Sequence, residues 1–293
     1  MLKLACIPAY NEESTISDVI REVKKYVDTV VVCDDGSNDK TSVRAEAAGA
    51  LVIKHEKNLG KGAAMKSLFQ YAKESSPEVM ITIDGDGQFL PEEIPKLMVP
   101  ILQKKSDIAI GCRFDDKTEM PSYRKAGNKF LDKITNMAST LSFRDTQSGF
   151  RAYSKKAIDA INITTNGFAV DSEILIDASR KGLRISEEKI TVVYKTGGKT
   201  STKGAVPHAT EVLTSLIEII ALRHPLRYLG IPGLILTIIG VIFSIFVIAI
   251  FNDTRYFSIP QTLIAIGALV LGLILLLMSV ILFSISKATK NLG

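Results

Sequence analysis

The strongest constraint on this chain is the uneven distribution of its charged residues. Of 36 Lys and Arg and 31 Asp and Glu residues, only Asp253, Arg255, Lys287 and Lys290 lie after Tyr228. The C-terminal region is too poor in charge for a water-facing domain, whereas the preceding part has nearly balanced charges and is long enough to enclose a substantial core. The sequence therefore predicts two parts that fold in different environments.

Two uninterrupted apolar stretches in the C-terminal region are long enough to cross a bilayer. Residues 229–251 and 262–285 contain no ionisable side chain, and each would measure about 35 Å as a helix. A buried hairpin in a soluble protein is the alternative, but helices that are apolar on every face would need a much larger protein around them. We predict two transmembrane helices over these ranges, followed by a tail over 286–293.

The charges flanking these stretches predict their orientation. Arg223 and Arg227 precede the first stretch and Lys287 and Lys290 follow the second, while the link 252–261 carries one Arg and one Asp. Because positive charge is retained in the cytoplasm, we expect a cell-membrane protein with the N-terminal domain and both termini on the cytoplasmic side. The stretches contain no ionisable residue that would line a solute path, so they are predicted to act as an anchor.

Small residues and an amphipathic segment complete the membrane part. Gly240 with Ser244, and Ala268 with Gly272, have the spacing that allows close helix packing, within one chain or in a homo-oligomer. Residues 210–222 place apolar side chains on one helical face. We predict an interfacial helix within 205–228, with packing against the N-terminal domain as an equal alternative.

The first 204 residues alternate short β-rich runs with helix-period segments, which predicts an α/β domain with a mainly parallel sheet. Expected strands are Leu2 to Ile7, Thr29 to Cys33, Leu51 to Ile53, Val79 to Ile83, Asp107 to Ile110 and Ile190 to Tyr194. Expected helices are Thr15 to Tyr26, Lys40 to Ala48, Gly62 to Ala72, Glu92 to Gln103, Arg124 to Ser139 and Asp171 to Arg180. Ligands of such sheets bind beyond the carboxyl ends of the strands.

Polar clusters follow three of the expected strands, at residues 8–13, 34–39 and 84–88, and Arg113 follows a fourth. No P-loop occurs, and the glycine spacing of a dinucleotide fingerprint is absent after the first strand. The net charge of +5 comes without a basic block, so nucleic-acid binding is not expected. The sequence predicts a carboxylate-rich crevice with a cation at its rim.

Asp84 and Asp86 have the alternation that allows carboxylates to address a divalent ion at a strand end. Oxygen ligands of this kind suit Mg²⁺ or Mn²⁺. The pair taken alone is equally compatible with a solvated turn before the next helix.

The joint order of six motifs resembles family-2 glycosyltransferases of the GT-A fold, and among them the membrane-bound polyprenyl-phosphate (dolichyl-phosphate) sugar synthases. The motifs are IPAYNEE, VVVCDDGSND, ITIDGDGQ, GCR, TQSGFRAYS and YKTGGKTS. The resemblance implies a Rossmann-like GT-A catalytic domain over 1–204 before the two-helix transmembrane hairpin, and a segment 114–122 that closes over the substrates. It also implies a nucleotide-sugar donor and a polyprenyl (dolichyl) phosphate acceptor in the lipid bilayer.

The resemblance also implies roles for individual residues. The donor's nucleoside would lie against Pro8, Tyr10, Glu12, Cys33 and Asp35, and its diphosphate and metal would lie against Asp84, Gly85, Asp86 and Gln88. Arg113 and Lys195 match positions where the family places cations near phosphates. With Arg124, a further candidate cation, and Asp86 they form the predicted catalytic set. Lys195 stands where the family usually has Arg, and Ser201 where mannose synthases usually have Lys.

The sequence thus predicts inverting transfer of a sugar to a lipid phosphate. Those two departures favour UDP-glucose or UDP-N-acetylglucosamine over GDP-mannose, because Lys does not reproduce the bidentate fork of Arg. A lipid monophosphate is already anionic near neutral pH and needs no general base. Transfer to another lipid or polysaccharide acceptor is an alternative. A polysaccharide synthase of this family should show a QxxRW motif, and the chain has no Trp. A protein, glycolipid or secondary-sugar acceptor would need a catalytic carboxylate, for which Asp145 and Glu173 are the candidates. A membrane-tethered, non-catalytic nucleotide-sugar-binding scaffold is the other alternative. Arg151, like Arg124, is either a surface cation or a site residue.

Overall fold

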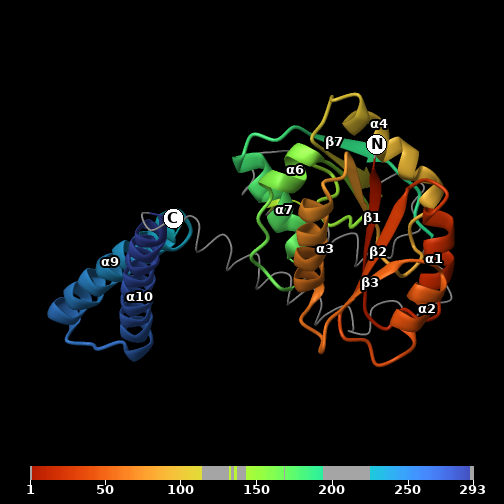
Figure 1. The fold of residues 1–293 in the computed structure, drawn as a ribbon. Helices are drawn as coiled ribbons and strands as arrows, with labels where there is room; N and C mark the ends of the chain where they lie inside the picture. Colours follow the sequence, from red (N-terminus) through yellow and green to blue (C-terminus); the bar gives the residue numbers. More distant parts are fainter. Residues whose placement is uncertain are drawn as a thin grey trace. The chain divides into compact units, whose positions relative to one another are not determined.

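A computed structural model describes residues 2–113, 132, 135–136, 143–167, 169–193 and 225–290, with side chains described as far as residue 284. The chain divides into two compact units, Met1–Leu216 and Ile217–Gly293. Each unit is described by itself below (Figure 1).

The first unit is built on a seven-stranded sheet with the order β3-β2-β1-β4-β6-β5-β7. The strands are β1 (Lys3–Ala9), β2 (Thr29–Asp34), β3 (Leu51–Lys54), β4 (Val79–Thr82), β5 (Ile108–Cys112), β6 (Arg151–Ser154) and β7 (Ile185–Lys189). β6 runs antiparallel to both β4 and β5, and every other pair is parallel. The predicted mainly parallel α/β domain is confirmed.

Side chains alternate along each strand and so point to both faces of the sheet. Helices cover both faces (Figure 1). α1 (Ile16–Val23), α2 (Thr41–Ala47) and α4 (Ile94–Leu102), the last preceded by the 3₁₀ turn η1 (Pro91–Glu93), pack in one apolar cluster with Ala5 and Ile7 of β1. α3 (Lys61–Ser75), α6 (Lys155–Ala160) and α7 (Val170–Arg180) pack in the other cluster with Leu4 and Cys6 of β1.

One predicted strand differs from the structure, and two short elements of the structure were not predicted. The strand expected at Ile190 to Tyr194 is wrong: the sheet strand is the preceding β7, and of residues 190–193 only Val192 makes an isolated bridge, to Phe89. β7 reads Ile-Ser-Glu-Glu-Lys because it is an edge strand with partly exposed faces, so it lacks the apolar signal of a buried strand. The short elements β6 and α6 were not predicted, and most of the helix expected at Arg124 to Ser139 lies outside the described residues.

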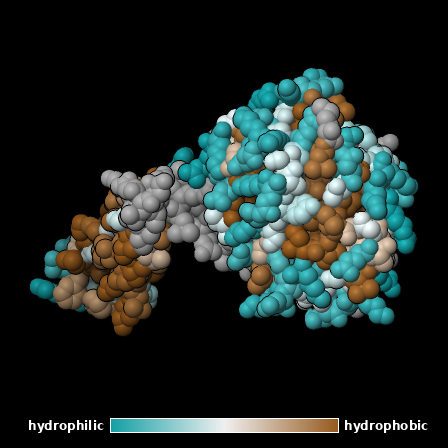
Figure 2. Space-filling model, viewed as in Figure 1, coloured by the Kyte–Doolittle hydropathy of each residue, from teal (hydrophilic) through white to brown (hydrophobic). Residues whose placement is uncertain are grey.

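The second unit contains a pair of long apolar helices, α9 (Ile231–Thr254), which follows the π-helical turn η2 (Leu226–Gly230), and α10 (Ile259–Lys290). The segments 226–254 and 259–284 are long and apolar enough to cross a membrane. Their surface is predominantly apolar (Figure 2), and side chains such as Ile242 and Leu277 are 58% and 64% exposed. A buried soluble hairpin would cover such side chains, so the membrane interpretation accounts better for them.

Glycines bring the two apolar helices into close backbone contact. A Cβ at Gly240 would lie 2.6 Å from the backbone nitrogen of Leu269, and one at Gly272 would lie 2.5 Å from that of Thr237. Gly240 and Gly272 each belong to one of the two small-residue spacings noted in the sequence. Both therefore pack against the other helix of the same chain.

Candidate active site

The carboxyl ends of β2, β1 and β4 bring the predicted polar clusters to one edge of the sheet. Ala9 at the end of β1 pairs with Asp34, and its carbonyl accepts a hydrogen bond from the backbone of Asp35. On the other side of β1, the backbone nitrogen of Ile83 donates to the carbonyl of Cys6, so residues 84–88 extend beyond the same edge. Pro8 and Tyr10 belong to this edge by their places in and after β1.

Asp35 is a buried and fully engaged carboxylate. Its oxygens accept hydrogen bonds from the backbone nitrogens of Leu59 and Gly60, and its Oδ1 lies 2.7 Å from Nδ1 of His55. The other ring nitrogen of His55 lies 2.9 Å from Ser67 Oγ and 3.5 Å from Cys33 Sγ. Burial, with the charges of the adjacent aspartates, raises the pKa of the Cys33 thiol to about 12, so this cysteine packs as a neutral group.

Glu12 is tied to the loop after β4 through one hydroxyl. Thr15 Oγ1 lies 3.2 Å from Glu12 Oε2 and donates to the carbonyl of Gly85 at 2.8 Å. Burial raises the pKa of Glu12 to about 7, and the negative charges of Asp86 and Asp84 add to the effect. Three carboxylates therefore share a region of negative potential.

Unlike Asp84, which pairs with Lys61, Asp86 forms no ion pair with the lysines and arginines that the structure describes. Within the described residues its side chain accepts a hydrogen bond from the backbone nitrogen of Gln88, at 3.0 Å. Burial and the charge of Asp84 raise its pKa to about 6, while Lys61 and Arg113 act in the opposite direction. A divalent cation would relieve this repulsion.

The residues present fit Mg²⁺ or Mn²⁺ of the kind that binds with a nucleotide. Among the described residues no group of three or more His, Cys, Asp or Glu side chains could hold a metal ion. Mg²⁺ commonly takes one or two carboxylates from the protein and completes its shell with phosphate oxygens and water. A metal here would be held by Asp86, with Asp84 beside it.

Asp84 is confined from two sides. Its Oδ1 lies 3.0 Å from Nζ of Lys61, which extends from the first residue of α3. On the other side is Gly149, where an added Cβ would lie 2.5 Å and 2.7 Å from the two oxygens of Asp84. Only a glycine at this position leaves room for the carboxylate.

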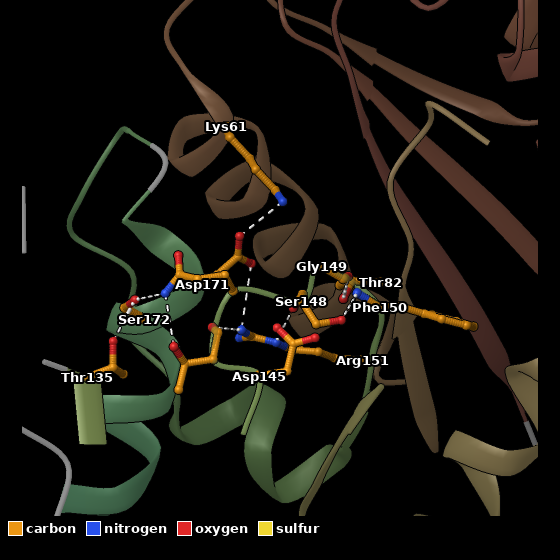
Figure 3. A network of polar contacts seen from close by, with 12 residues as sticks. Lys61, Thr82, Thr135, Asp145, Ser148, Gly149, Phe150, Arg151, Asp171 and Ser172 are labelled. Carbon is orange, nitrogen blue, oxygen red and sulfur yellow. Dashed lines mark hydrogen bonds and ion pairs between the residues drawn. The ribbon is translucent and has the colours of Figure 1, made fainter. Parts of the chain in front are cut away.

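Lys61 also connects Asp84 to a buried ionic network. Figure 3 shows the part of this network that runs from Lys61 through Asp171 to Arg151. Its Nζ lies 3.1 Å from Asp171 Oδ2 in α7, and Asp171 Oδ1 lies 3.9 Å from Nη2 of Arg151. Arg151 is fully buried and donates to the carbonyls of Thr146 and Ser148. The interpretation of Arg151 as a surface cation is wrong, because its charge is enclosed by these acceptors.

Arg113, at the end of β5, is held by a carboxylate rather than free at the rim. Its Nε and Nη2 donate to Asp145 Oδ2 and Oδ1 at 2.7 Å and 2.8 Å, and its backbone nitrogen donates to the same side chain. Asp145 is fully buried. This bidentate geometry fixes the guanidinium plane and occupies the carboxylate.

Glu173 is likewise committed to the fold. It is fully buried in α7 and accepts hydrogen bonds from the backbones of Thr164 and Thr165 and from the Thr164 hydroxyl. The two carboxylates that would serve as a base for another acceptor, Asp145 and Glu173, are therefore both engaged by protein donors.

The structure brings most of the predicted site residues to one region and adds others. Glu12, Asp84, Gly85, Asp86 and Gln88 share contacts or electrostatic coupling there. Arg124, Lys195 and the predicted closing segment 114–122 lie outside the described residues. Sequence reasoning missed Lys61, Gly149 and Asp171. Lys61 carried one signal, since a lysine in the first turn opposes the helix dipole and calls for another explanation.

The mainly parallel sheet with helices on both faces is a Rossmann-like GT-A fold. The glucosyl-3-phosphoglycerate synthase of Mycobacterium tuberculosis, solved with Mg²⁺ and UDP, shares the fold with a TM-score of 0.59 at 20% identity, over 74% of this chain and 78% of that one. The family model described as Glycosyl transferase family 2 matches residues 5–161. The chain belongs to this family and is a glycosyltransferase.

Two curated relatives act on dolichyl lipids, by their names. The UDP-N-acetylglucosamine–dolichyl-phosphate N-acetylglucosaminyltransferase of Methanococcus voltae is 32% identical over 211 residues, which cover 64% of this chain and 84% of that protein. The dolichol-phosphate mannosyltransferase of Pyrococcus furiosus is 31% identical over 211 residues, which cover 68% of this chain and 58% of that protein. These relatives use different sugars, so the donor does not follow from the family.

Proposed function

We propose that this glycosyltransferase transfers a sugar from a nucleotide-sugar to a polyprenyl (dolichyl) phosphate at the cytoplasmic face of the membrane. The observation that carries the proposal is the group of carboxylates around Asp86, with the charge of Arg113 close enough to act on it. The same chain has two helices able to cross a membrane. The named activities of the relatives from Methanococcus and Pyrococcus support the same acceptor.

The donor side of the site is assigned to residues after β1, β2 and β4. Pro8, Tyr10, Glu12, Cys33 and Asp35 would line the nucleoside pocket, and Asp84, Gly85, Asp86 and Gln88 would face the diphosphate. A bound Mg²⁺ or Mn²⁺, held by Asp86 beside Asp84, would supply Lewis-acid stabilisation of charge on the leaving phosphate.

The acceptor side needs positive charge rather than a base. The phosphate oxygen of the lipid would bond to the anomeric carbon while the bond from that carbon to the donor's β-phosphate oxygen breaks, with inversion, and the nucleoside diphosphate leaves. Arg113 is held in a fixed plane by Asp145, which suits it to receive a phosphate. Arg124 and Lys195 are proposed as further cations. The engagement of Asp145 and Glu173 by protein donors supports an acceptor that is already anionic.

We favour UDP-N-acetylglucosamine or UDP-glucose over GDP-mannose as the donor. The replacement of the usual family arginine by Lys195 and the Methanococcus relative's use of UDP-N-acetylglucosamine support this choice. The two apolar helices would anchor the enzyme beside a substrate whose chain stays in the bilayer.

Product analysis with a donor panel tests the proposal. Full-length protein in detergent is given dolichyl phosphate, Mg²⁺ or Mn²⁺, and UDP-glucose, UDP-N-acetylglucosamine or GDP-mannose in separate reactions, each repeated with EDTA. We expect a sugar-phospho-dolichol from one UDP-sugar, and none with EDTA. Product from GDP-mannose alone would refute the donor assignment, and no lipid product from any donor would refute the acceptor.

A further inference from the structure

Lys61 is a buried cation placed between two carboxylates of the site region. Its ammonium lies 3.0 Å from Asp84 Oδ1. It also lies 3.1 Å from Asp171 Oδ2, a contact drawn in Figure 3. Its side chain is 16% exposed, so water screens these contacts little. The ammonium therefore pairs with both carboxylates at once.

The backbone around Lys61 is shaped to hold it there. Gly60 has a φ of +98°, which other residues rarely adopt, and a Cβ on Gly60 would overlap the carbonyl oxygen of Asn166. A Cβ on Gly62 would overlap the carbonyl oxygen of Thr165, and the backbone nitrogen of Gly62 donates to Asn166 at 2.8 Å. The start of α3 is thus packed directly on this loop.

That loop is itself fixed from α7. Glu173 accepts hydrogen bonds from the backbones of Thr164 and Thr165, and Asp171, two residues earlier in the same helix, holds the ammonium of Lys61. One helix therefore sets both the position of the loop and the second contact of the lysine. The position of Lys61 is determined by the fold rather than by a flexible surface contact.

We propose that Lys61 is a positioning residue that occupies and neutralises Asp84, so that the protein alone binds a divalent cation weakly and the cation enters with the nucleotide diphosphate. With Asp84 paired, Asp86 is the carboxylate left to bind the ion, and phosphate oxygens must supply the remaining ligands. This inference rests on the proposed donor site, and it goes further by assigning the origin of metal–nucleotide coupling to one lysine.

The charge of Lys61 predicts the direction in which the affinity for the cation changes, which a merely structural role would not predict. Replacing Lys61 by Met removes one positive charge and frees Asp84 as a second ligand, so the affinity for the cation alone should rise. The same change should weaken binding of the anionic diphosphate. Since coupling between two ligands is reciprocal, the factor by which nucleotide and cation strengthen each other should fall.

Mn²⁺ binding measured by electron paramagnetic resonance tests this without turnover. Free Mn²⁺ is titrated with full-length protein in detergent, alone and with UDP or GDP, for wild type, Lys61→Met and Lys61→Arg. Lys25→Met is the matched control, because Lys25 also pairs with a carboxylate, Glu22, but on an exposed helix face. Circular dichroism checks that each variant is folded.

We expect Lys61→Met to bind Mn²⁺ alone about 5 to 10 times more tightly than wild type, and to lose most of the coupling with nucleotide. Lys61→Arg and Lys25→Met should retain the wild-type coupling. Weaker Mn²⁺ binding by Lys61→Met, or an unchanged affinity and coupling, would overturn the inference, as would the absence of coupling in wild type. The donor panel decides the proposed function independently of these results.

Asp171→Asn provides a second test if Lys61→Met does not fold. This change removes the competing carboxylate and leaves Lys61 wholly to Asp84. The affinity for Mn²⁺ alone should then fall several-fold, opposite to the effect of Lys61→Met. A rise in this affinity would contradict the proposal.

Discussion

Arg113 and Asp145 form a bidentate ion pair, with Nε donating to Oδ2 at 2.7 Å and Nη2 donating to Oδ1 at 2.8 Å. The arginine directly follows β5 and the aspartate precedes β6, so the pair joins the ends of two neighbouring strands. Such a pair fixes the plane of the guanidinium, which favours a defined approach of phosphate.

Asp145→Asn tests whether this pair positions Arg113. The amide keeps the shape of the carboxylate but loses its charge and one acceptor, so transfer should fall about 10- to 100-fold. The free energy of unfolding should also fall by about 1–3 kcal/mol, because the arginine charge loses its partner. Steady-state kinetics and thermal unfolding measure the two effects, and wild-type kcat/KM would rule out the positioning role.

Asp86→Ala tests the assignment of the metal carboxylate. Metal-dependent transfer should be lost while the fold is retained, because within the described residues the Asp86 side chain accepts one hydrogen bond, from the nearby Gln88. Removal of a carboxylate from this region should also lower the pKa of Glu12 toward its usual range, since Asp86 helps to raise it. Turnover and circular dichroism are the measurements. Unchanged metal-dependent turnover would show that the ion is bound elsewhere.

Gly149→Ala tests the confinement of Asp84. The added methyl group would lie 2.5 Å from Asp84 Oδ2, so either this carboxylate or the loop before β6 must move. We expect at least a tenfold loss of transfer and a destabilisation of about 1–3 kcal/mol. Gly267→Ala is a suitable control because an added Cβ there meets no atom within 4 Å. Equal activity of both variants would mean that the position of Asp84 is unimportant.

The sequence predicted which polar residues share one edge of the sheet, but not the residues that hold them in place there. Parallel strands end at a common edge, so Asp35, Asp84 and Asp86 could be placed together from their positions after apolar runs. Lys61 and Asp171 are 110 residues apart and meet only through packing of α3 against α7. The pattern of apolar residues along the chain does not indicate such a contact.

Errors in the predicted strands have a similar origin. β6 begins with Arg151, which reads as a polar residue although it is fully buried, because loop carbonyls satisfy its guanidinium. Residues 190–193 read as a strand because they are β-branched, but the sheet edge is formed by the more polar β7. Burial of charge and exposure of an edge strand both depend on tertiary partners.

Asp107 should make stability depend on pH in the acid range. Its carboxylate accepts hydrogen bonds from the backbone nitrogen, Nε and Nη2 of Arg184. Burial acts to raise its pKa, but these hydrogen bonds and the charge of Arg184 prevail, and the pKa lies below its usual range. The resulting stability is present above the unfolded-state pKa of about 4 and is lost as the pH falls through the lower folded-state value.

Asp107→Asn isolates this contribution. The substitution should reduce the free energy of unfolding by about 1–2 kcal/mol at pH 7, and the difference from wild type should shrink below about pH 3. Thermal unfolding of the full-length protein, followed by circular dichroism at both pH values, measures it. A difference that is the same at both pH values would show that the charge of Asp107 is not responsible.

The membrane orientation is open to a direct labelling test. Single cysteines at the N-terminus, at the C-terminus and at Tyr256 in the link between α9 and α10 are treated with a membrane-impermeant thiol reagent in intact cells. The charges flanking the helices predict labelling at Tyr256 alone. Labelling of either terminus from outside would refute the two-span orientation.

The comparison of dolichyl phosphate with dolichol as acceptor tests the central claim most directly. Purified full-length enzyme receives each lipid with its preferred nucleotide-sugar and Mg²⁺ or Mn²⁺, and the lipid products are identified by mass spectrometry. If the acceptor must bring its own negative charge, dolichyl phosphate should yield a sugar-phospho-dolichol and dolichol should yield nothing. Sugar attached to dolichol itself, or no product from dolichyl phosphate, would contradict the proposed reaction.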